Sequence, residues 1–491
     1  MIVVLGYIVF GVYVICLCVI AIYCIIQFHL LFHYLRKNAP HSPIEVASDD
    51  LPMVTIQLPI FNEYFVVERL IENIIEIEYP KDKIEIQVLD DSTDDTVLLS
   101  RKLVDKYKAL GFDIKLIQRE DRKGYKAGAL KQAMHTARGE FIAIFDADFL
   151  PKPDFLKKTI PLFQDEKVAV VQTRWGHLNQ GHSLLTEVQA FQLNVHFTVE
   201  QKGRQLGNYL LQFNGTAGVW RAEAIEDAGG WEADTLTEDL DLSYRAQLKG
   251  WKIKYMEETV SPAELPAEMM GLKSQQHRWM KGGAETAKKL LPKVWGSELS
   301  LIEKVHGSIH LLGSSVFLSI FMVGVFSVPL MFVVLPTGLD PSMLKVFVIS
   351  TIIIAIIYFV ANVRTAWEGR FFKLLFKFVV LFPIFLSLSM GLSFHNSIAV
   401  IQGYLGKKTP FVRTPKFDIK GISSKLRDKK YHKYSLSKIV LMEGFLSLYF
   451  LAAVLMGISI GNFSLMPLHI MLFFGYGGIF FYSVKHFSPK G

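Results

Sequence analysis

Acidic residues directly follow two apolar segments of this chain, and their spacing suits a metal site. The first segment leads into Asp90 and Asp91, and the second leads into Asp146 and Asp148, which are two positions apart. Carboxylates this close at the end of a buried strand repel each other unless a cation shares them. A single pair fits a solvated turn with an acidic helix cap equally well. Together, the two pairs predict a site where Mg²⁺ or Mn²⁺ bridges a diphosphate.

A third group of acids occurs downstream, in the segment Thr237-Glu238-Asp239. One interpretation is structural: Thr237 caps a helix whose first turn is acidic, where negative charge is favourable. The other interpretation makes one of the two carboxylates a general base that takes a proton from an acceptor hydroxyl. Taken alone, the segment favours the structural interpretation.

The first two acidic pairs lie in a part of the chain where strand patterns alternate with helix patterns. This order predicts an α/β domain with a mostly parallel, doubly wound sheet. Ligands of such sheets bind at the carboxyl ends of the strands, which is where the acids lie. Strands are predicted at residues 53–58, 84–89, 114–118, 141–145 and 168–172, and helices at 66–76, 96–110 and 128–136.

Long apolar segments flank this domain, and about 20 such residues suffice to cross a membrane. The first segment is predicted to be a retained anchor, because no basic region precedes it and no small-residue cleavage site is evident. Arg36 and Lys37 follow it, which predicts a cytosolic domain with the N-terminus outside. Spans are predicted at residues 5–30, 308–335, 345–363, 437–459 and 466–484.

One further apolar segment, residues 378–403, conflicts with a simple count of spans. The basic segments 364–377 and 407–438 predict that both of its ends lie inside, so it should cross an even number of times. It is too short for two full crossings. We therefore expect a re-entrant or interfacial helical hairpin broken near Pro383, in addition to five full spans.

The net charge of +7 does not indicate nucleic acid, because much of the positive charge lies beside apolar segments. There, lysine and arginine typically mark cytosolic loops that meet anionic lipid headgroups. The three cysteines all lie in the first apolar segment and indicate no disulfide framework. We divide the chain into a membrane anchor (1–35), a cytosolic domain (50–295) with interfacial helices at its end, and a membrane region (300–491).

Residues 275–279 read Q-Q-H-R-W and change the interpretation of the acids. Together with the three acidic sites, they resemble the D, D, D, Q-x-x-R-W pattern of family 2 glycosyltransferases, the group that contains cellulose, chitin, hyaluronan and mannan synthases. The resemblance covers residues 52–295 and continues into the membrane region, and it is strongest to cellulose-synthase-like mannan and glucan synthases. It implies a GT-A-type nucleotide-sugar domain inserted between transmembrane helices.

The resemblance assigns roles to individual residues. It implies that Asp239, next to Glu238, is the general base and that Arg278 stabilises the leaving diphosphate. It also implies that Asp148, together with Asp146, holds the metal ion. The nucleotide sugar is expected to bind Phe61, Glu63, Asp91, Lys126, Asp146, Gln275 and Arg278.

Four residues occupy places where relatives line the path of the acceptor sugar. Trp279 is expected to stack on that sugar, because the apolar face of an indole matches the C–H face of a pyranose. Gly215 permits close approach of the backbone to sugar. The acceptor residues implied by the resemblance are Trp279, Asn214, Gly215 and Trp175.

A loop between membrane segments, residues 404–436, is similar to the F-x-V-T-x-K gating loop that covers the nucleotide in cellulose synthase. Phe411, Thr414 and Lys416 stand at the matching positions and are expected to contact the nucleotide sugar, whereas Arg413 replaces a valine. The alternative is a basic loop that contacts lipid headgroups.

These residues predict an inverting, metal-dependent, processive β-glycosyltransferase that polymerises a hexose into a glucan or mannan backbone and moves the polymer across the membrane. UDP-glucose and GDP-mannose both fit as donors, with a slight preference for UDP-glucose that no residue supports. The alternative enzyme is a lipid-acceptor glycosyltransferase of the ceramide-glucosyltransferase type, which adds a single sugar. A transporter that merely binds nucleotide would leave Asp239 and residues 275–279 without a role. The catalytic domain is expected on the cytosolic face of a plasma or inner membrane, or of the Golgi in a eukaryote.

Overall fold

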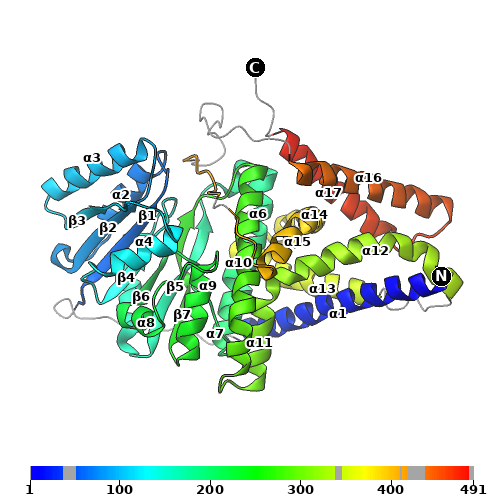
Figure 1. Cartoon of the computed structure of the whole chain (residues 1–491), viewed down its shortest axis with the longest axis horizontal. Helices are drawn as coiled ribbons and strands as arrows, with labels where there is room; N and C mark the ends of the chain where they lie inside the picture. Colours follow the sequence, from blue (N-terminus) through cyan, green and yellow to red (C-terminus); the bar gives the residue numbers. More distant parts are fainter. Residues whose placement is uncertain (1, 37–50, 338–344, 410–411, 419–436, 486–491) are drawn as a thin grey trace.

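The structure is a computed structural model of the whole chain, and it describes residues 2–36, 51–337, 345–409, 412–418 and 437–485. A sheet with its covering helices forms one end of the molecule, and long apolar helices form the other (Figure 1). Helices α10 (Met269–Trp295) and α11 (Leu301–Leu311) lie between these two parts.

The sheet has seven strands in the order β3-β2-β1-β4-β6-β5-β7. Its strands are β1 (Val54–Ile60), β2 (Ile84–Asp90), β3 (Ile114–Ile117), β4 (Phe141–Ile144), β5 (Val168–His177), β6 (Gly218–Arg221) and β7 (Lys252–Ala263). Only β6 runs antiparallel to its neighbours, so the predicted mostly parallel sheet is confirmed. Five of these strands were predicted, whereas β6 and β7 were missed.

Helices cover both faces of the sheet and enclose two apolar cores. The helices of this domain are α2 (Val67–Ile75), α3 (Thr96–Ala109), α4 (Tyr125–Met134), α5 (Phe155–Thr159), α6 (Leu184–Val195), α7 (Gln201–Leu206), α8 (Ala222–Asp227) and α9 (Glu238–Leu248). Successive residues of a strand point to opposite faces, so in β4 Phe141 packs into one core and Ile142 into the other. Helices α2, α3 and α5 close the first core, and α4, α8 and α9 close the second.

The other end of the molecule is built from long apolar helices. They are α1 (Ile2–Leu35), α12 (Val316–Thr337), α13 (Lys345–Phe359), α14 (Phe371–Gly391), α15 (Ser393–Tyr404), α16 (Lys438–Ser459) and α17 (Met466–Lys485). Within the described residues, six helical segments are long and apolar enough to cross a membrane: Val4–Leu35, Gly313–Phe332, Val346–Ala366, Phe371–Gly391, Lys438–Ser459 and Met466–Lys485. Large apolar side chains such as Leu448 and Phe474 are exposed on their outer faces, as expected for contact with lipid.

The fourth of these segments, α14, corrects one prediction. A break was expected near Pro383, but α14 continues through this proline as one helix and ends at Gly391. The break lies instead between Gly391 and Ser393, where α15 begins. A proline is tolerated inside an apolar helix when neighbouring helices and side chains compensate for the lost hydrogen bond.

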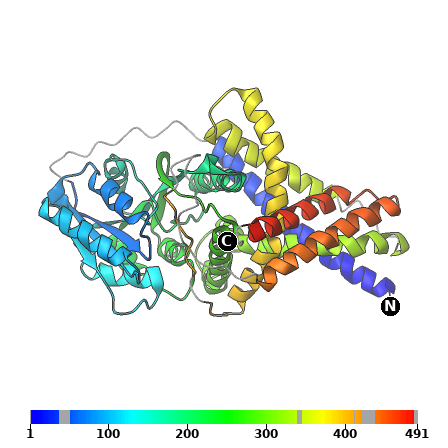
Figure 2. The same ribbon diagram turned by 90° about the horizontal axis from the view of Figure 1, so that it is seen from above.

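The expected hairpin is also wrong, because α15 continues from α14 after a bend. Only Leu392 separates the two helices, its backbone is helical (φ −76°, ψ −11°), and the N–H of Asn396 donates to its backbone oxygen at 2.9 Å. The start of α14 lies beside α6, where Lys377 pairs with Glu187 at 2.6 Å. The end of α15 lies beside α10, where Lys288 donates to the backbone oxygen of Tyr404 at 2.9 Å. Figure 2 shows α14 running across the direction of the other long helices.

A buried ion pair connects α10 to the long helices. Lys273 Nζ lies 2.5 Å from Glu443 on α16 and donates to Ser483 on α17 at 2.9 Å. All three side chains are buried. Helix α10, which carries the Q-Q-H-R-W segment, is thereby fixed to α16 and α17 by charge as well as by apolar packing.

Removing one partner of this pair should be strongly destabilising. We expect Lys273→Met to lower the free energy of unfolding by about 3–5 kcal/mol, because the Glu443 carboxylate is left buried without a counter-charge. The measurement is the unfolding temperature of the purified protein in detergent. The matched control, Lys273→Met combined with Glu443→Leu, removes both charges and should recover most of the loss. A double variant as unstable as the single one would contradict this account.

Candidate active site

The residues singled out in the sequence come together around one cavity of about 250 Å³ at the carboxyl ends of the parallel strands. We call it the donor pocket. Of the predicted residues, only Phe411 lies outside the described part of the chain. The others all line the donor pocket: Phe61, Glu63, Asp91, Lys126, Asp146, Asp148, Trp175, Asn214, Gly215, Glu238, Asp239, Gln275, Arg278, Trp279, Thr414 and Lys416.

Asp146 and Asp148 follow β4 and each faces a lysine ammonium. Lys126 pairs with Asp146 and also donates to the backbone oxygen of Gly215 at 2.8 Å. Lys416 donates to Asp148 at 2.6 Å. At the edge of the cavity, each carboxylate therefore already has a positively charged lysine side chain as its partner. Two hard oxygen donors in this arrangement fit Mg²⁺ or Mn²⁺, with a cation taking the place of a lysine nitrogen.

The loop segment 412–418 lies against the pocket through ion pairs at both ends. Arg413 pairs with Glu63 at 2.9 Å, and Asp418 pairs with Arg69 at 2.5 Å. Between them, the backbone N–H of Phe417 donates to Glu264 at 2.7 Å. The arginine that departs from the gating-loop pattern is thus the residue that fixes the first half of this segment.

Glu63 is half-buried, and its desolvation raises its pKa to about 7 even though the Arg413 charge opposes the shift. Glu63 was expected to bind the nucleotide sugar, and it lines the donor pocket while it also holds the loop segment through Arg413.

Two arginines between β3 and α4 shape the far end of the donor pocket. Arg119 donates to Asp91 through Nε at 2.9 Å and through a second guanidinium nitrogen, so both oxygens of this carboxylate are engaged. The guanidinium carbon of Arg122 lies 3.2 Å from the centre of the Phe61 ring. Such a cation–π pair presents a flat surface at the place where the nucleotide is expected.

Asp239 sits at the N-terminus of α9, where the helix dipole favours negative charge. Its Oδ1 accepts from the backbone N–H of Leu240 at 2.8 Å. Burial, and then the neighbouring charge of Glu238, raise the pKa of Asp239 to about 7. A carboxylate with this pKa is well matched to a general base that works near neutral pH.

The residues around Asp239 are packed so closely that two nearby glycines, Gly215 and Gly282, have no space for a larger side chain. Gly215 has φ +80°, and a Cβ at this position would lie 2.8 Å from Asp239 Oδ2. Thr237 occupies the N-cap position of α9, but the prediction that its side chain caps the helix is wrong. Its hydroxyl lies 3.0 Å from that of Thr286 on α10, because α10 packs closely here. A Cβ on Gly282 of α10 would lie 2.6 Å from the Thr237 side chain.

Helix α10 brings Gln275, Arg278 and Trp279 to the same cavity. Arg278 donates to the backbone oxygen of Val412 at 2.6 Å and to the hydroxyl of Thr414 at 3.2 Å. Burial lowers the pKa of Arg278 to about 10, so the guanidinium remains charged at neutral pH. Arg278 therefore joins α10 to the loop segment 412–418 beside the pocket.

A second cavity of about 300 Å³ opens from the first, and we call it the acceptor pocket. It reaches the long helices, because Tyr23 of α1, Phe317 of α12 and Tyr358 of α13 line it. The side chains shared by the two pockets mark the junction between them. They are Trp175, Leu193, Asn214, Thr237, Asp239 and Trp279.

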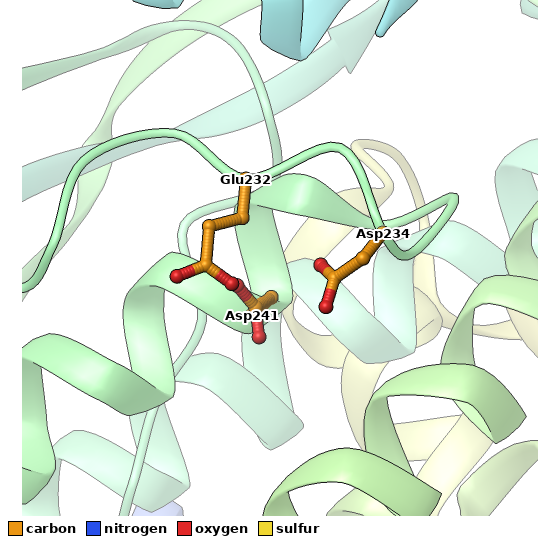
Figure 3. Close-up of side chains that lie close together, drawn as sticks. All are labelled: Glu232, Asp234 and Asp241. Carbon is orange, nitrogen blue, oxygen red and sulfur yellow. The ribbon is translucent and has the colours of Figure 1, made fainter.

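A separate acidic cluster lies on the outer side of α9. Figure 3 shows the carboxylates of Glu232, Asp234 and Asp241 close together, and within the described residues this is the group whose spacing could hold a metal ion. Lys289 of α10 already lies among them, at 2.5 Å from Glu232 and at 2.9 Å from each aspartate. The cluster is therefore an ion-pair network that holds α9, and with it Asp239, against α10.

Two residues that line the donor pocket, Arg122 and Glu264, were missed from the sequence, and so was Arg119, which pairs with the lining residue Asp91. Glu264 directly follows β7, and its backbone N–H donates to Asp148 at 3.1 Å. An acid at a strand end was the signal that identified Asp146, and the same signal would have found Glu264 if β7 had been predicted. The arginines lie in a basic segment before α4 that carries no comparable pattern.

Comparison with known proteins agrees with the family resemblance that the sequence motifs indicated. Residues 52–282 match the family model described as Glycosyltransferase like family 2. The chain is 41% identical over 270 residues to glucomannan 4-beta-mannosyltransferase 7 of Arabidopsis thaliana, covering 54% of this chain and 49% of that protein. It is 41% identical over 273 residues to glucomannan 4-beta-mannosyltransferase 1 of Oryza sativa subsp. japonica, covering 54% and 52%. The chain thus spans roughly half the length of these curated relatives.

Among solved structures, the chain is similar to the mannosyltransferase PcManGT of Pyrobaculum calidifontis, determined in complex with GDP-Man and Mn²⁺. The similarity covers 81% of this chain and 99% of that protein, with a TM-score of 0.52 and 18% sequence identity. At this identity the similarity concerns the fold.

Proposed function

We propose that this chain, whose residues 52–282 belong to glycosyltransferase family 2, is an inverting β-mannosyltransferase that extends a polysaccharide from a nucleotide sugar. The observation that carries the proposal is the position of Asp239. This carboxylate lines both the donor pocket and the acceptor pocket, so it can meet an acceptor hydroxyl from one side and the donor sugar from the other.

The arrangement suits a single displacement. Asp239 takes the proton of the acceptor hydroxyl while that oxygen forms a bond to C1 of the α-linked donor sugar. The bond between C1 and the diphosphate oxygen breaks, and the configuration inverts to β. Arg278, which is charged and lines the donor pocket, stabilises the negative charge on the departing diphosphate. A divalent cation held by Asp146 and Asp148 would supply further positive charge to that diphosphate.

The donor sugar is chosen from the relatives. The residues of the donor pocket suit a nucleotide diphosphate without distinguishing glucose from mannose. The curated relatives at 41% identity are named mannosyltransferases. We therefore propose GDP-mannose as the donor, in place of the slight preference for UDP-glucose, and a β-mannan or glucomannan backbone as the product.

We further propose that the product leaves through the long apolar helices. The acceptor pocket begins at Asp239 and is lined by side chains of α1, α12 and α13. Its wall is rich in aromatic and polar side chains, which suits a sugar chain better than an acyl chain. The basic residues that follow α1, Arg36 and Lys37, favour a cytosolic position for the sheet domain.

The test supplies radiolabelled GDP-mannose and UDP-glucose, separately and together, to the purified full chain in nanodiscs with Mg²⁺ or Mn²⁺. We expect GDP-mannose to yield a product of high molecular weight that β-mannanase digests, and Asp239→Asn to yield none. A single labelled sugar on extracted lipid would instead support the lipid-acceptor alternative. Incorporation from UDP-glucose alone, with none from GDP-mannose, would overturn the choice of donor.

A further inference from the structure

A chain of hydrogen bonds runs along the wall of the acceptor pocket and ends on Asn214. Helix α6 continues into a π-helical turn, His196–Glu200, before α7 begins. Short π-helical segments are often found at functional sites. His196 and Glu200 both line the acceptor pocket, and His196 Nδ1 lies 2.8 Å from Glu200 Oε2.

The other ring nitrogen of His196 meets Asn214. His196 Nε2 lies 2.9 Å from Asn214 Oδ1, and Gln212 Nε2 donates to the same oxygen at 2.8 Å. An oxygen atom thus lies within hydrogen-bond distance of each ring nitrogen, and the ring is held between Glu200 and Asn214. Burial raises the pKa of Glu200, but His196, the Arg204 charge and a hydrogen bond from Gln27 together leave that pKa below its ordinary value. Glu200 is thus a carboxylate that holds the His196 ring in place.

Gln212 is oriented in turn from α11. Its side-chain oxygen lies 3.1 Å from His310 Nε2, and His310 Nδ1 lies 2.8 Å from the hydroxyl of Tyr244. With its oxygen directed at His310, Gln212 presents its amide N–H to Asn214. The backbone of Asn214 is fixed separately, because its N–H donates to Gln172 at 2.8 Å.

These contacts leave one donor unused. Asn214 is 8% exposed, and its Nδ2 is buried with no hydrogen-bond partner among the described residues. A buried amide donor without a partner carries a cost unless a ligand satisfies it. Asn214 lies at the junction of the two pockets together with Asp239, Trp175 and Trp279, where the last sugar of an acceptor would lie.

We propose that His196 is a positioning residue which, with Gln212, turns the side-chain amide of Asn214 so that its N–H₂ donates to a hydroxyl oxygen of the acceptor saccharide. The placement of the acceptor rests on the proposed function. Asn214 contacts the sugar, whereas His196 acts through Asn214 and is itself held by Glu200. The arrangement fixes the acceptor next to Asp239, where a small misplacement would be costly for transfer.

The test compares variants that break the network with one that keeps it. His196→Leu removes the donor that orients Asn214, and His196→Gln keeps an N–H donor at that position. Asn214→Asp keeps an oxygen for His196 and Gln212 but removes the N–H₂ group. The matched control is His135→Leu, an exposed histidine that lines neither pocket.

The first measurement is the affinity of the full chain in nanodiscs for β-linked manno-oligosaccharides. We expect His196→Leu and Asn214→Asp each to weaken it about tenfold, the effect of losing one hydrogen bond to a sugar. His196→Gln should restore most of the affinity, and His135→Leu should not change it. The variant that combines His196→Leu with Asn214→Asp should bind the saccharide no more weakly than Asn214→Asp alone, because both changes remove the same contact.

The second measurement is the ratio of transfer to hydrolysis of GDP-mannose. Transfer to the oligosaccharide should fall relative to hydrolysis by water in His196→Leu and Asn214→Asp, and in His135→Leu the ratio should equal that of the wild type. Unchanged saccharide affinity and an unchanged ratio in both variants would overturn the inference. Wild-type protein that binds the oligosaccharide, loses this binding in the variants and yet transfers no sugar would instead contradict the proposed function alone.

Discussion

Replacing Asp239 by Asn will reduce sugar transfer by at least about a hundredfold, because a general base contributes about 10²–10⁴-fold to such a reaction. The amide cannot accept the proton of the acceptor hydroxyl. Its shape is close to that of the carboxylate, and the hydrogen bond from the Leu240 N–H can be kept. The variant should therefore still bind the nucleotide sugar, which separates a loss of chemistry from a loss of binding. Transfer rate and nucleotide affinity are to be measured on the same preparation.

The same residue should set the pH dependence of the wild-type enzyme. The base works only when deprotonated, and the pKa of Asp239 is about 7. Transfer should therefore rise about tenfold per pH unit well below pH 7 and level off above it. The charge of Glu238 is one cause of the raised pKa. Glu238→Gln should thus move the rising limb to lower pH while activity is retained. If Glu238→Gln abolished transfer and Asp239→Asn did not, the two roles would be reversed.

Replacing Asp148 by Asn will raise the concentration of Mn²⁺ needed for half-maximal activity by at least about a hundredfold. Loss of a residue that only supports a metal ligand already costs about 10–100-fold in affinity, and here a charged ligand itself is lost. A chelator should abolish transfer by the wild type, and added Mn²⁺ or Mg²⁺ should restore it. The measurement is transfer rate as a function of free metal ion.

Asp90→Asn is the matched control for the metal experiment. Asp90 is also a buried acid at the end of a strand, but it does not line the donor pocket. Its Oδ1 accepts from the backbone N–H of Ser92 at 2.9 Å, and an asparagine oxygen can take the same bond. The metal dependence of this variant should match that of the wild type. Equal shifts in Asp90→Asn and Asp148→Asn would show that general loss of acidity, rather than loss of a ligand, is responsible.

Much of the sheet domain follows from local sequence pattern. The segments that form β1 to β5 are short, apolar and rich in residues that favour strands. The composition of each segment alone therefore predicts a buried strand. β6 has four residues and β7 is a long strand of alternating exposure that pairs with β5 across a shift in register. Such strands are stabilised by their neighbours in the sheet more than by their own composition, and this is why they were missed.

The bent α14–α15 segment shows the same limit in the membrane region. The charges on either side of the segment predict that both ends lie on one side, and the two ends lie beside α6 and α10. The position of the break does not follow from proline, because tight packing of Gly391 against Gly475 fixes where α14 ends. That contact joins residues far apart in the chain, so no local pattern reveals it.

The sequence by itself determined which side chains are candidates for the chemistry, because acids follow the predicted strands and the Q-Q-H-R-W segment has a distinctive composition. It also determined which segments are long and apolar enough to cross a membrane, since apolar length is a local property. The tertiary structure decided which side chains share a cavity. Arg119, Glu264 and His196 reach the site from segments with no pattern that marks them, and only the folded sheet brings them to Asp91, Asp148 and Asn214. The physical reason is that a hydrogen bond between distant segments depends on packing, which composition and spacing do not encode locally.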